Sequence, residues 1–268
     1  MNQVLDGFRF SLCFAFLLYA SWNDLKTREV SNKVWIIFGP LAFTLTFIEL
    51  LRYENLELPL YGICFGLTAA FSIILFYSGG FGGADAKALM CLALALPFYP
   101  EGLLTPVWGE ISPISQSFFP ITVFSNSVLL AAATAVYMFL RNVISHKIAK
   151  KKLFDEEFVN ESFGRKILVL ITGYKVSVKK LKERWHLYPL EDLENVEGKL
   201  KRKLVILPKD EGRNGIVERL VGAVKARKIK DKVWATPGLP MLVFITAGLI
   251  IALFLGDIIW ISISFLLG

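Results

Sequence analysis

The stretch Gly79-Gly-Phe-Gly-Gly-Ala-Asp-Ala-Lys-Ala-Leu-Met90 places a carboxylate, Asp85, between two long apolar runs. An ionised Asp at membrane depth costs roughly 3 kcal/mol on insertion scales, so a chain that keeps one usually uses it. The four glycines before it permit a sharp turn and the close approach of another chain. The alternative interpretation is a plain turn whose Asp caps the following helix. A second acid at a matching depth would favour a functional role over a cap.

Composition predicts a membrane protein. The chain has 268 residues, of which 54% are hydrophobic and 20% are charged, and its mean hydropathy is +0.53. A chain this apolar must segregate its charges, and a transmembrane helix needs about 20 apolar residues. We therefore predict an all-α polytopic membrane protein with six transmembrane helices. The six candidate spans lie near residues 8–22, 33–51, 58–78, 84–98, 118–140 and 238–262.

The distribution of Lys and Arg predicts the orientation of these spans. The loop 99–117 has no Lys or Arg, whereas residues 141–237 hold 24 of the chain's 30 basic residues. Cytoplasmic loops carry the excess of positive charge, so we expect a cell-membrane protein with its amino terminus outside and its large polar segment inside. Asp24, at the end of the first span, and Asp85, at the start of the fourth, then lie near the same cytoplasmic face.

Residues 142–233 form the polar region and contain 23 Lys or Arg against 13 Asp or Glu. We predict a small α+β cytoplasmic domain inserted between helices 5 and 6, with residues 1–141 carrying helices 1 to 5 and residues 234–268 carrying helix 6. The net charge predicts contact with anionic lipid headgroups. Nucleic-acid binding is not expected, because basic and aromatic residues are not interleaved.

Local patterns predict the elements of this domain, and one residue beyond it. Residues 166–172 and 203–207 are expected to be short strands, 175–178 alternates as a strand does, and 215–228 has a helical period. Trp234 is expected at the membrane interface of the last span.

Two carboxylates held close together cannot both ionise easily, and they tend to share a proton. One can then act as a base that activates water, while the other donates a proton to the scissile carbonyl and the leaving amine. Asp24 and Asp85 are thus the candidate catalytic residues of an aspartic endopeptidase. No metal or cofactor is expected, since no CxxC occurs and the cysteines lie singly in apolar runs, as Cys13, Cys64 and Cys91.

Three motifs resemble those of the archaeal preflagellin and type IV prepilin peptidases, which are intramembrane aspartyl proteases. The motifs are Asp24-Leu-Lys-Thr-Arg-Glu-Val-Ser-Asn-Lys-Val-Trp35, Gly82-Gly-Ala-Asp-Ala-Lys87 and Val233-Trp-Ala-Thr-Pro-Gly-Leu-Pro240. The resemblance implies that Asp24 and Asp85 form the catalytic pair. It also implies that pilin-like or archaellin precursors are the substrates, cut behind a short basic leader at the inner membrane face.

This chain departs from the family's pattern in two ways. Ala84 replaces the glycine often found directly before the second Asp, which restricts positive φ at that position. The paired-cysteine zinc element of the bacterial members that also methylate the new amino terminus is missing, so we expect no methyltransferase activity.

Another function is compatible with the two acids. Asp24 and Asp85 could relay protons or bind an ion in a cation-coupled transporter or channel. Transporters of that kind often contain repeated halves and bind near the bilayer midplane, whereas this chain shows no internal repeat and its acids are expected at one face. A third acid in an apolar run, Asp257, is expected on the outer side with a structural role.

Overall fold

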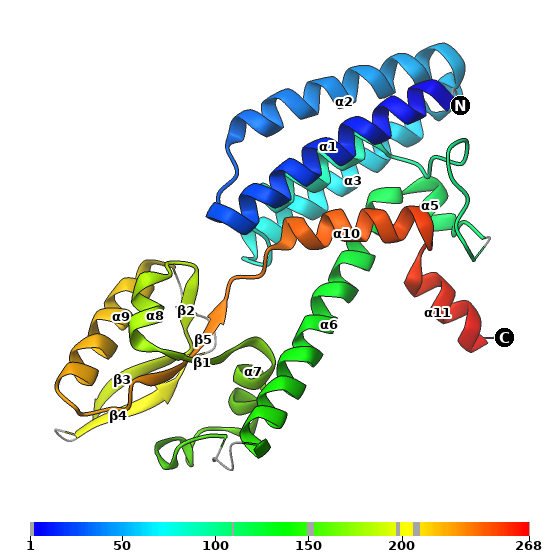
Figure 1. Ribbon diagram of the computed structural model, residues 1–268. Coiled ribbons are helices and arrows are strands. Elements are labelled where there is room, and N and C mark those ends of the chain that lie inside the picture. Colours follow the sequence, from blue (N-terminus) through cyan, green and yellow to red (C-terminus); the bar gives the residue numbers. More distant parts are fainter. Residues whose placement is uncertain (1–2, 109, 149–152, 197–198, 206–209, 268) are drawn as a thin grey trace. The chain divides into compact units, whose positions relative to one another are not determined.

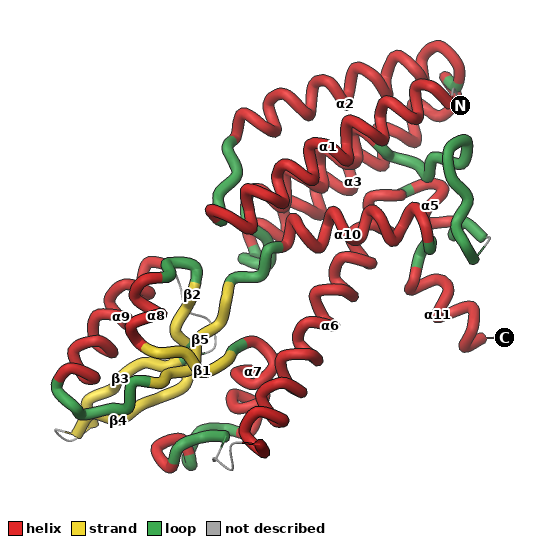
Figure 2. The backbone as a smooth tube through the Cα atoms, viewed as in Figure 1, coloured by secondary structure: helices red, strands yellow, loops and turns green. Residues whose placement is uncertain are grey.

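The computed structural model describes residues 3–108, 110–148, 153–196, 199–205 and 210–267 (Figures 1 and 2). Its internal contacts divide the chain into two units. Met1–Ala131 and Pro240–Gly268 form one, which we call the helical unit, and Ala132–Leu239 form the other, which we call the α+β unit.

Within the described residues, four helices are long and apolar enough to cross a membrane, so the chain is a multi-pass membrane protein. They are α1 (Gln3–Thr27), α2 (Asn32–Tyr53), α3 (Leu58–Tyr77) and α6 (Phe119–Ile148). The predicted sixth span is a pair of helices, α10 (Met241–Phe254) and α11 (Ile258–Leu267), bent by 52° at the break between them. Gly256, with φ of +92°, makes this break in a conformation that suits glycine.

The predicted fourth span forms a shorter helix than expected. α4 (Gly83–Ala95) has 13 residues, about 20 Å at 1.5 Å per residue, against a hydrocarbon core of about 30 Å. Pro97 and Pro100 follow it, and a proline cannot continue a helix. The count of six spans therefore stays a prediction.

α4 lies at the centre of the helical unit. It contacts α1, α2, α3 and α10, and seven of its side chains are buried, four of them alanines. Small side chains let neighbouring helices approach closely. The carbonyl groups at its carboxyl end, which have no partner within the helix, accept bonds from neighbouring helices. Thr46 Oγ1 donates to Ala95 O at 3.2 Å, and Tyr61 Oη donates to Leu94 O at 3.3 Å.

The α+β unit contains a three-stranded antiparallel sheet in the order β1 (Tyr174–Ser177), β5 (Lys232–Pro237), β2 (Leu187–Pro189). Strands β3 (Glu191–Val196) and β4 (Lys199–Leu204) pair as a hairpin. Helices α8 (Val178–Glu183) and α9 (Asp210–Lys225) pack together beside the strands, as Figure 2 shows. The strand predicted at 175–178 and the helix predicted at 215–228 are therefore confirmed within a few residues. β4 ends within the strand predicted at 203–207, of which residues 206 and 207 lie outside the described part of the chain.

β5 shows why two apolar clusters form in this unit. Successive side chains of a strand point to opposite faces. Val233 and Ala235 join the cluster under α8 and α9, whereas Trp234 joins a second cluster with Phe158 and Leu170. Trp234 is fully buried, so its predicted place at a membrane interface is wrong. From the sequence alone, a buried tryptophan that precedes an apolar run cannot be distinguished from a tryptophan at the membrane interface.

The strand predicted at residues 166–172 is also wrong. These residues belong to α7 (Phe163–Thr172), whose first turn is capped by Ser162 Oγ accepting from Arg165 N at 3.3 Å. A short apolar run does not distinguish a strand from a buried helix. The cap at Ser162 and the burial of Val169 and Leu170, which lie on the helix face packed into the core, decide for the helix.

Candidate active site

Asp24 lies near the end of α1, three residues before the helix ends at Thr27. Its side chain is half-buried, and its Oδ2 finds no hydrogen-bond donor among the residues that the structure describes. The carboxylate faces the backbone N–H of Leu242, in the first turn of α10. The first N–H groups of a helix have no partner within it and carry partial positive charge. The start of α10 therefore stabilises a negative charge on Asp24 without supplying a charged side chain.

Hydrogen bonds hold the start of α10 against α1 beside Asp24. Ser21, one turn before the acid, donates from Oγ to Leu242 O at 2.9 Å, and its Oγ lies 2.7 Å from Thr246 Oγ1. Thr246 Oγ1 in turn lies 3.3 Å from Leu17 O. We call Ser21, Leu242 and Thr246 the α1–α10 latch. The sequence analysis missed it because Ser21 lies more than 200 residues from Leu242 and Thr246.

Asp85 is the third residue of α4, and Gly82 stands at the cap position. Asp85 Oδ2 accepts from Gly82 N at 3.0 Å, so the acid bonds back to the turn that precedes it. A Cβ on Gly82 would lie 3.0 Å from this oxygen, and Gly79 has φ of +77°. The capping interpretation of Asp85 is thus partly right, because one carboxylate oxygen does cap the helix.

The structure brings Asp24 and Asp85 together. α1 packs against α4, and the two carboxylates interact electrostatically across this contact. In the described part of the chain, neither carboxylate has a Lys or Arg nitrogen within 4 Å. Arg28 adds a longer-range attraction to Asp24. Two acids at one site without an ion pair are the arrangement in which a shared proton is favoured.

Lys87, two residues after Asp85, is held away from the acids. Its Nζ donates to Asn32 Oδ1 at 2.7 Å. Asn32 is the first residue of α2, which Ser31 caps by accepting from Lys33 N at 3.3 Å. The bond ties the stretch after Asp24 to the stretch after Asp85. The sequence pattern did not reveal this role of Asn32 as the acceptor for Lys87.

Comparisons with known proteins agree with the motifs. A family model described as "Type IV leader peptidase family" matches residues 11–139, which include Asp24 and Asp85. A second, described as "Archaeal Peptidase A24 C-terminus Type II", matches residues 165–258.

The chain is also similar to curated relatives over most of its length. A preflagellin peptidase of Methanococcus voltae is 30% identical over 250 residues, which cover 90% of this chain and 92% of that protein. A preflagellin peptidase of Methanocaldococcus jannaschii is 29% identical, over 90% of this chain and 91% of that protein. The resemblance inferred from the three motifs is confirmed: the chain belongs to the type IV leader peptidase family.

Proposed function

We propose that this protein is an aspartyl endopeptidase of the membrane, with Asp24 and Asp85 as its catalytic pair. The observation that carries the proposal is geometric: α1, which carries Asp24, packs against α4, which carries Asp85, and no ion pair holds either carboxylate in the described residues. Both acids lie in the segment matched by the leader peptidase family.

The chemistry follows from a pair that shares one proton. The ionised carboxylate takes a proton from water, and the resulting hydroxide bonds to the scissile carbonyl carbon. The protonated carboxyl donates its proton to the carbonyl oxygen. When the tetrahedral intermediate collapses, the C–N bond breaks and the amine leaves with a proton from the first carboxyl. A hydroxyl of the intermediate returns a proton to the second carboxylate as the new carboxyl group forms, which restores the pair. The products are a free carboxyl terminus on the leader and a new amino terminus on the mature protein.

The substrate is inferred from the relatives. They are named preflagellin peptidases, and the family is named for type IV leader peptides. We propose that the chain removes the short basic leader from archaellin or pilin-like precursors. The charge asymmetry of the loops supports a site at the cytoplasmic face, where such a leader is held.

We also propose that the new amino terminus is left unmethylated. Cys13, Cys64 and Cys91 are each buried in the helical unit and remain free thiols, which does not resemble a paired-cysteine zinc element. Mass spectrometry of the processed precursor should find an unmodified amino terminus. A methylated product formed by the purified chain with a methyl donor would contradict this.

Single substitutions test the catalytic pair. A precursor co-expressed with Asp24→Asn or Asp85→Asn should remain uncut, while both variants reach the membrane in normal amount. Glu29→Gln is the matched control, since Glu29 is an exposed carboxylate five residues after Asp24. Residual cleavage by either aspartate variant would count against a shared-proton pair, and normal cleavage by both would exclude it.

A further inference from the structure

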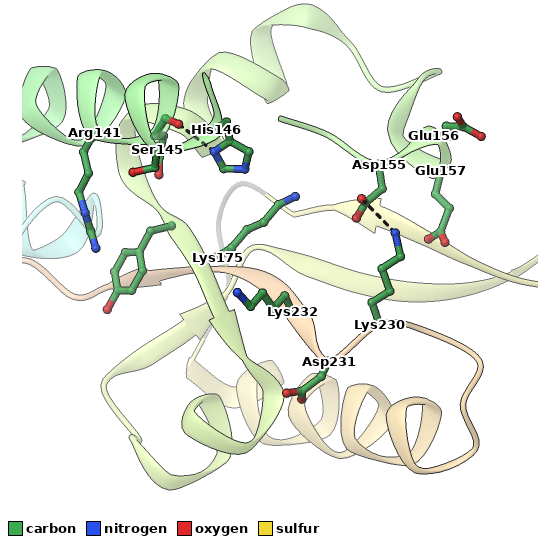
Figure 3. Close-up of a pocket in the computed structure, with 12 residues that line it drawn as sticks. Arg141, Ser145, His146, Asp155, Glu156, Glu157, Lys175, Lys230, Asp231 and Lys232 are labelled. Atoms are coloured by element: carbon green, nitrogen blue, oxygen red, sulfur yellow. Dashed lines mark hydrogen bonds and ion pairs between the residues drawn. The ribbon is translucent and has the colours of Figure 1, made fainter. Parts of the chain in front are cut away.

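The α+β unit contains a cavity of about 1110 Å³ that the proposed peptidase chemistry does not use. It is lined by the last turns of α6, the segment around η2 (Glu156–Phe158), β1 and the start of β5. Figure 3 shows Arg141, Lys175 and Lys232 reaching into this space from three different elements. We call these three residues the cationic set.

The acidic side chains that line the cavity already have partners. Asp155 lies 3.2 Å from Arg202 and 3.7 Å from Lys230, as the dashed line in Figure 3 marks for the second pair. Asp231 Oδ1 accepts from Val178 N at 3.2 Å. Glu157 lies 3.7 Å from Arg202 Nε. These acids therefore form no close ion pair with the cationic set, although Asp155 attracts Lys175 at longer range.

Two members of the cationic set have aromatic neighbours, and none of the three forms a close ion pair. Over the described ranges, no carboxylate oxygen lies within 4 Å of Arg141, Lys175 or Lys232. Arg141 lies over the Tyr174 ring at 5.2 Å, and Lys175 Nζ lies over the Trp234 ring at 5.4 Å. Contacts of this kind position a cation without cancelling its charge.

A bound anion would stabilise the charged form of Lys175. Its side chain is half-buried, and burial lowers the pKa of its ammonium. Asp155 and Glu191 raise that pKa, while Arg202 and Lys230 lower it further. An anion at Nζ would replace the water that the ammonium has lost.

The position of Arg141 indicates where the anion can come from. α6 has 30 residues, about 45 Å, which exceeds the hydrocarbon thickness of about 30 Å. Arg141 follows the apolar run 119–140 directly, at the depth where Arg side chains reach lipid headgroups. One wall of the cavity thus begins where the helix leaves the apolar layer.

We propose that the cavity binds a phosphate group, with the cationic set as its ligands. Arg binds phosphate through paired N–H groups and Lys binds it as a point charge. The phosphate group can be carried by an anionic lipid headgroup or by a soluble phosphate compound. This site is independent of the peptidase reaction, so it can exist whether or not Asp24 and Asp85 are catalytic.

Binding to the full chain in a neutral detergent tests the site. The probes are dioctanoyl phosphatidylglycerol, dioctanoyl phosphatidylcholine and glycerol 3-phosphate, with affinities measured by titration calorimetry. We expect the wild type to bind the phosphatidylglycerol more tightly than the phosphatidylcholine. Each cation contributes about 5-fold, so Lys175→Gln with Lys232→Gln should weaken that binding about 25-fold.

Lys179→Gln with Lys182→Gln is the matched control. These lysines are exposed on α8, outside the cavity lining, and the change in net charge is the same. The control should change affinity less than 2-fold. An equal loss in both double variants would overturn the site, because it would show attraction to net charge alone. No loss in the Lys175 and Lys232 variant would overturn it as well.

Two further results complete the test. Arg141 lines the cavity from α6, and Arg141→Gln should weaken binding about 5-fold. This variant keeps the proposal testable if the double variant fails to fold. Glycerol 3-phosphate that binds at least 10-fold more weakly than the lipid supports a headgroup ligand. Equal binding of the two supports a soluble phosphate compound at the same site. Failure of all probes to bind the wild type would overturn the proposal.

Discussion

The two ends of α1 hold acidic side chains in contrasting environments. Asp6, near the amino end, is fully buried and forms an ion pair with Arg9, whose Nε also lies 2.9 Å from Glu49 Oε2 on α2. Asp24, near the other end, is half-buried, lies on the helix that packs against the one carrying Asp85, and has no Lys or Arg nitrogen within 4 Å in the described residues.

This difference separates a structural acid from a candidate catalytic one. A buried charge is tolerated when a partner compensates its lost hydration, and the pair then holds elements together. An acid without a cation partner keeps its tendency to take up a proton, which an acid–base catalyst needs. We therefore expect Asp24 to matter for activity and Asp6, on the same helix, to matter for stability.

The largest expected effect tests this contrast at the candidate site. Asp24→Asn and Asp85→Asn should each lower the rate of leader cleavage about 10³-fold or more, since each removes one proton-transfer group. The thermal midpoint of each variant in detergent should stay at or above that of the wild type, because a half-buried acid without a close cation is replaced by a neutral amide. A large fall in the midpoint together with the rate would indicate a structural role instead.

The opposite outcome is expected at the other end of α1. Arg9→Met leaves the buried Asp6 without its cation, which should cost about 3–5 kcal/mol of unfolding free energy. The fraction that remains folded should cleave at the wild-type rate. Arg52→Met is the control, because Arg52 is an exposed arginine of α2.

A compensated variant sharpens this second prediction. Asp6→Asn, Arg9→Met and Glu49→Gln together remove the three charges of this cluster and should recover most of the lost stability, since Asp6 no longer carries a buried charge without its cation. If the triple variant is no more stable than Arg9→Met alone, the loss comes from packing and not from charge.

A smaller effect is expected at the α1–α10 latch. Ser21→Ala removes the bond to Leu242 O and the contact with Thr246, so we expect a loss of about 1 kcal/mol of stability. Because the amide of Leu242 faces Asp24, the turnover rate should fall about 10-fold while KM changes little. Ser72→Ala is the control, since the buried hydroxyl of Ser72 bonds within its own helix, to Thr68 O. Equal effects of the two variants would show that the α1–α10 latch contributes only as a buried hydrogen bond and does not position Leu242 for catalysis.

The sequence predicted the two candidate acids and missed much of what surrounds them. Asp24 and Asp85 stood out because an acid in an apolar run is rare, and charge asymmetry suggested a common depth. The latch could not be predicted, because Ser21 and Thr246 are separated by 225 positions and their pairing depends on how helices pack.

Local ambiguity explains the errors in the α+β unit. Residues 166–172 are rich in branched apolar side chains, which suit a strand or a buried helix equally well. Trp234 is followed within a few residues by the apolar run of α10, so its burial in a separate core was hidden by its position in the sequence. In both cases a tertiary contact decided what the local pattern left open.

The smallest expected effect concerns Asp155, an acid of the α+β unit that is paired with cations as Asp6 is. Burial raises the pKa of Asp155, but Lys175, Arg202 and Lys230 together lower it more, so this pKa lies below its usual value. An unfolded Asp has a pKa of about 3.9, so the stabilisation is complete above about pH 4 and is lost as the pH falls through the lower pKa of the folded state. Asp155→Asn should therefore lower the free energy of unfolding at pH 6, by less than about 1 kcal/mol since the side chain is partly exposed.

The pH dependence identifies the cause of that loss. The difference between wild type and Asp155→Asn should shrink as the pH falls below about 4, because the wild-type carboxyl is then protonated and neutral like the amide. Glu183→Gln, an exposed acid on α8, should show no such dependence. A difference that persists unchanged at pH 3 would mean that Asp155 stabilises the α+β unit through its shape and hydrogen bonds, and the distinction between paired and unpaired acids would then not rest on charge at this position.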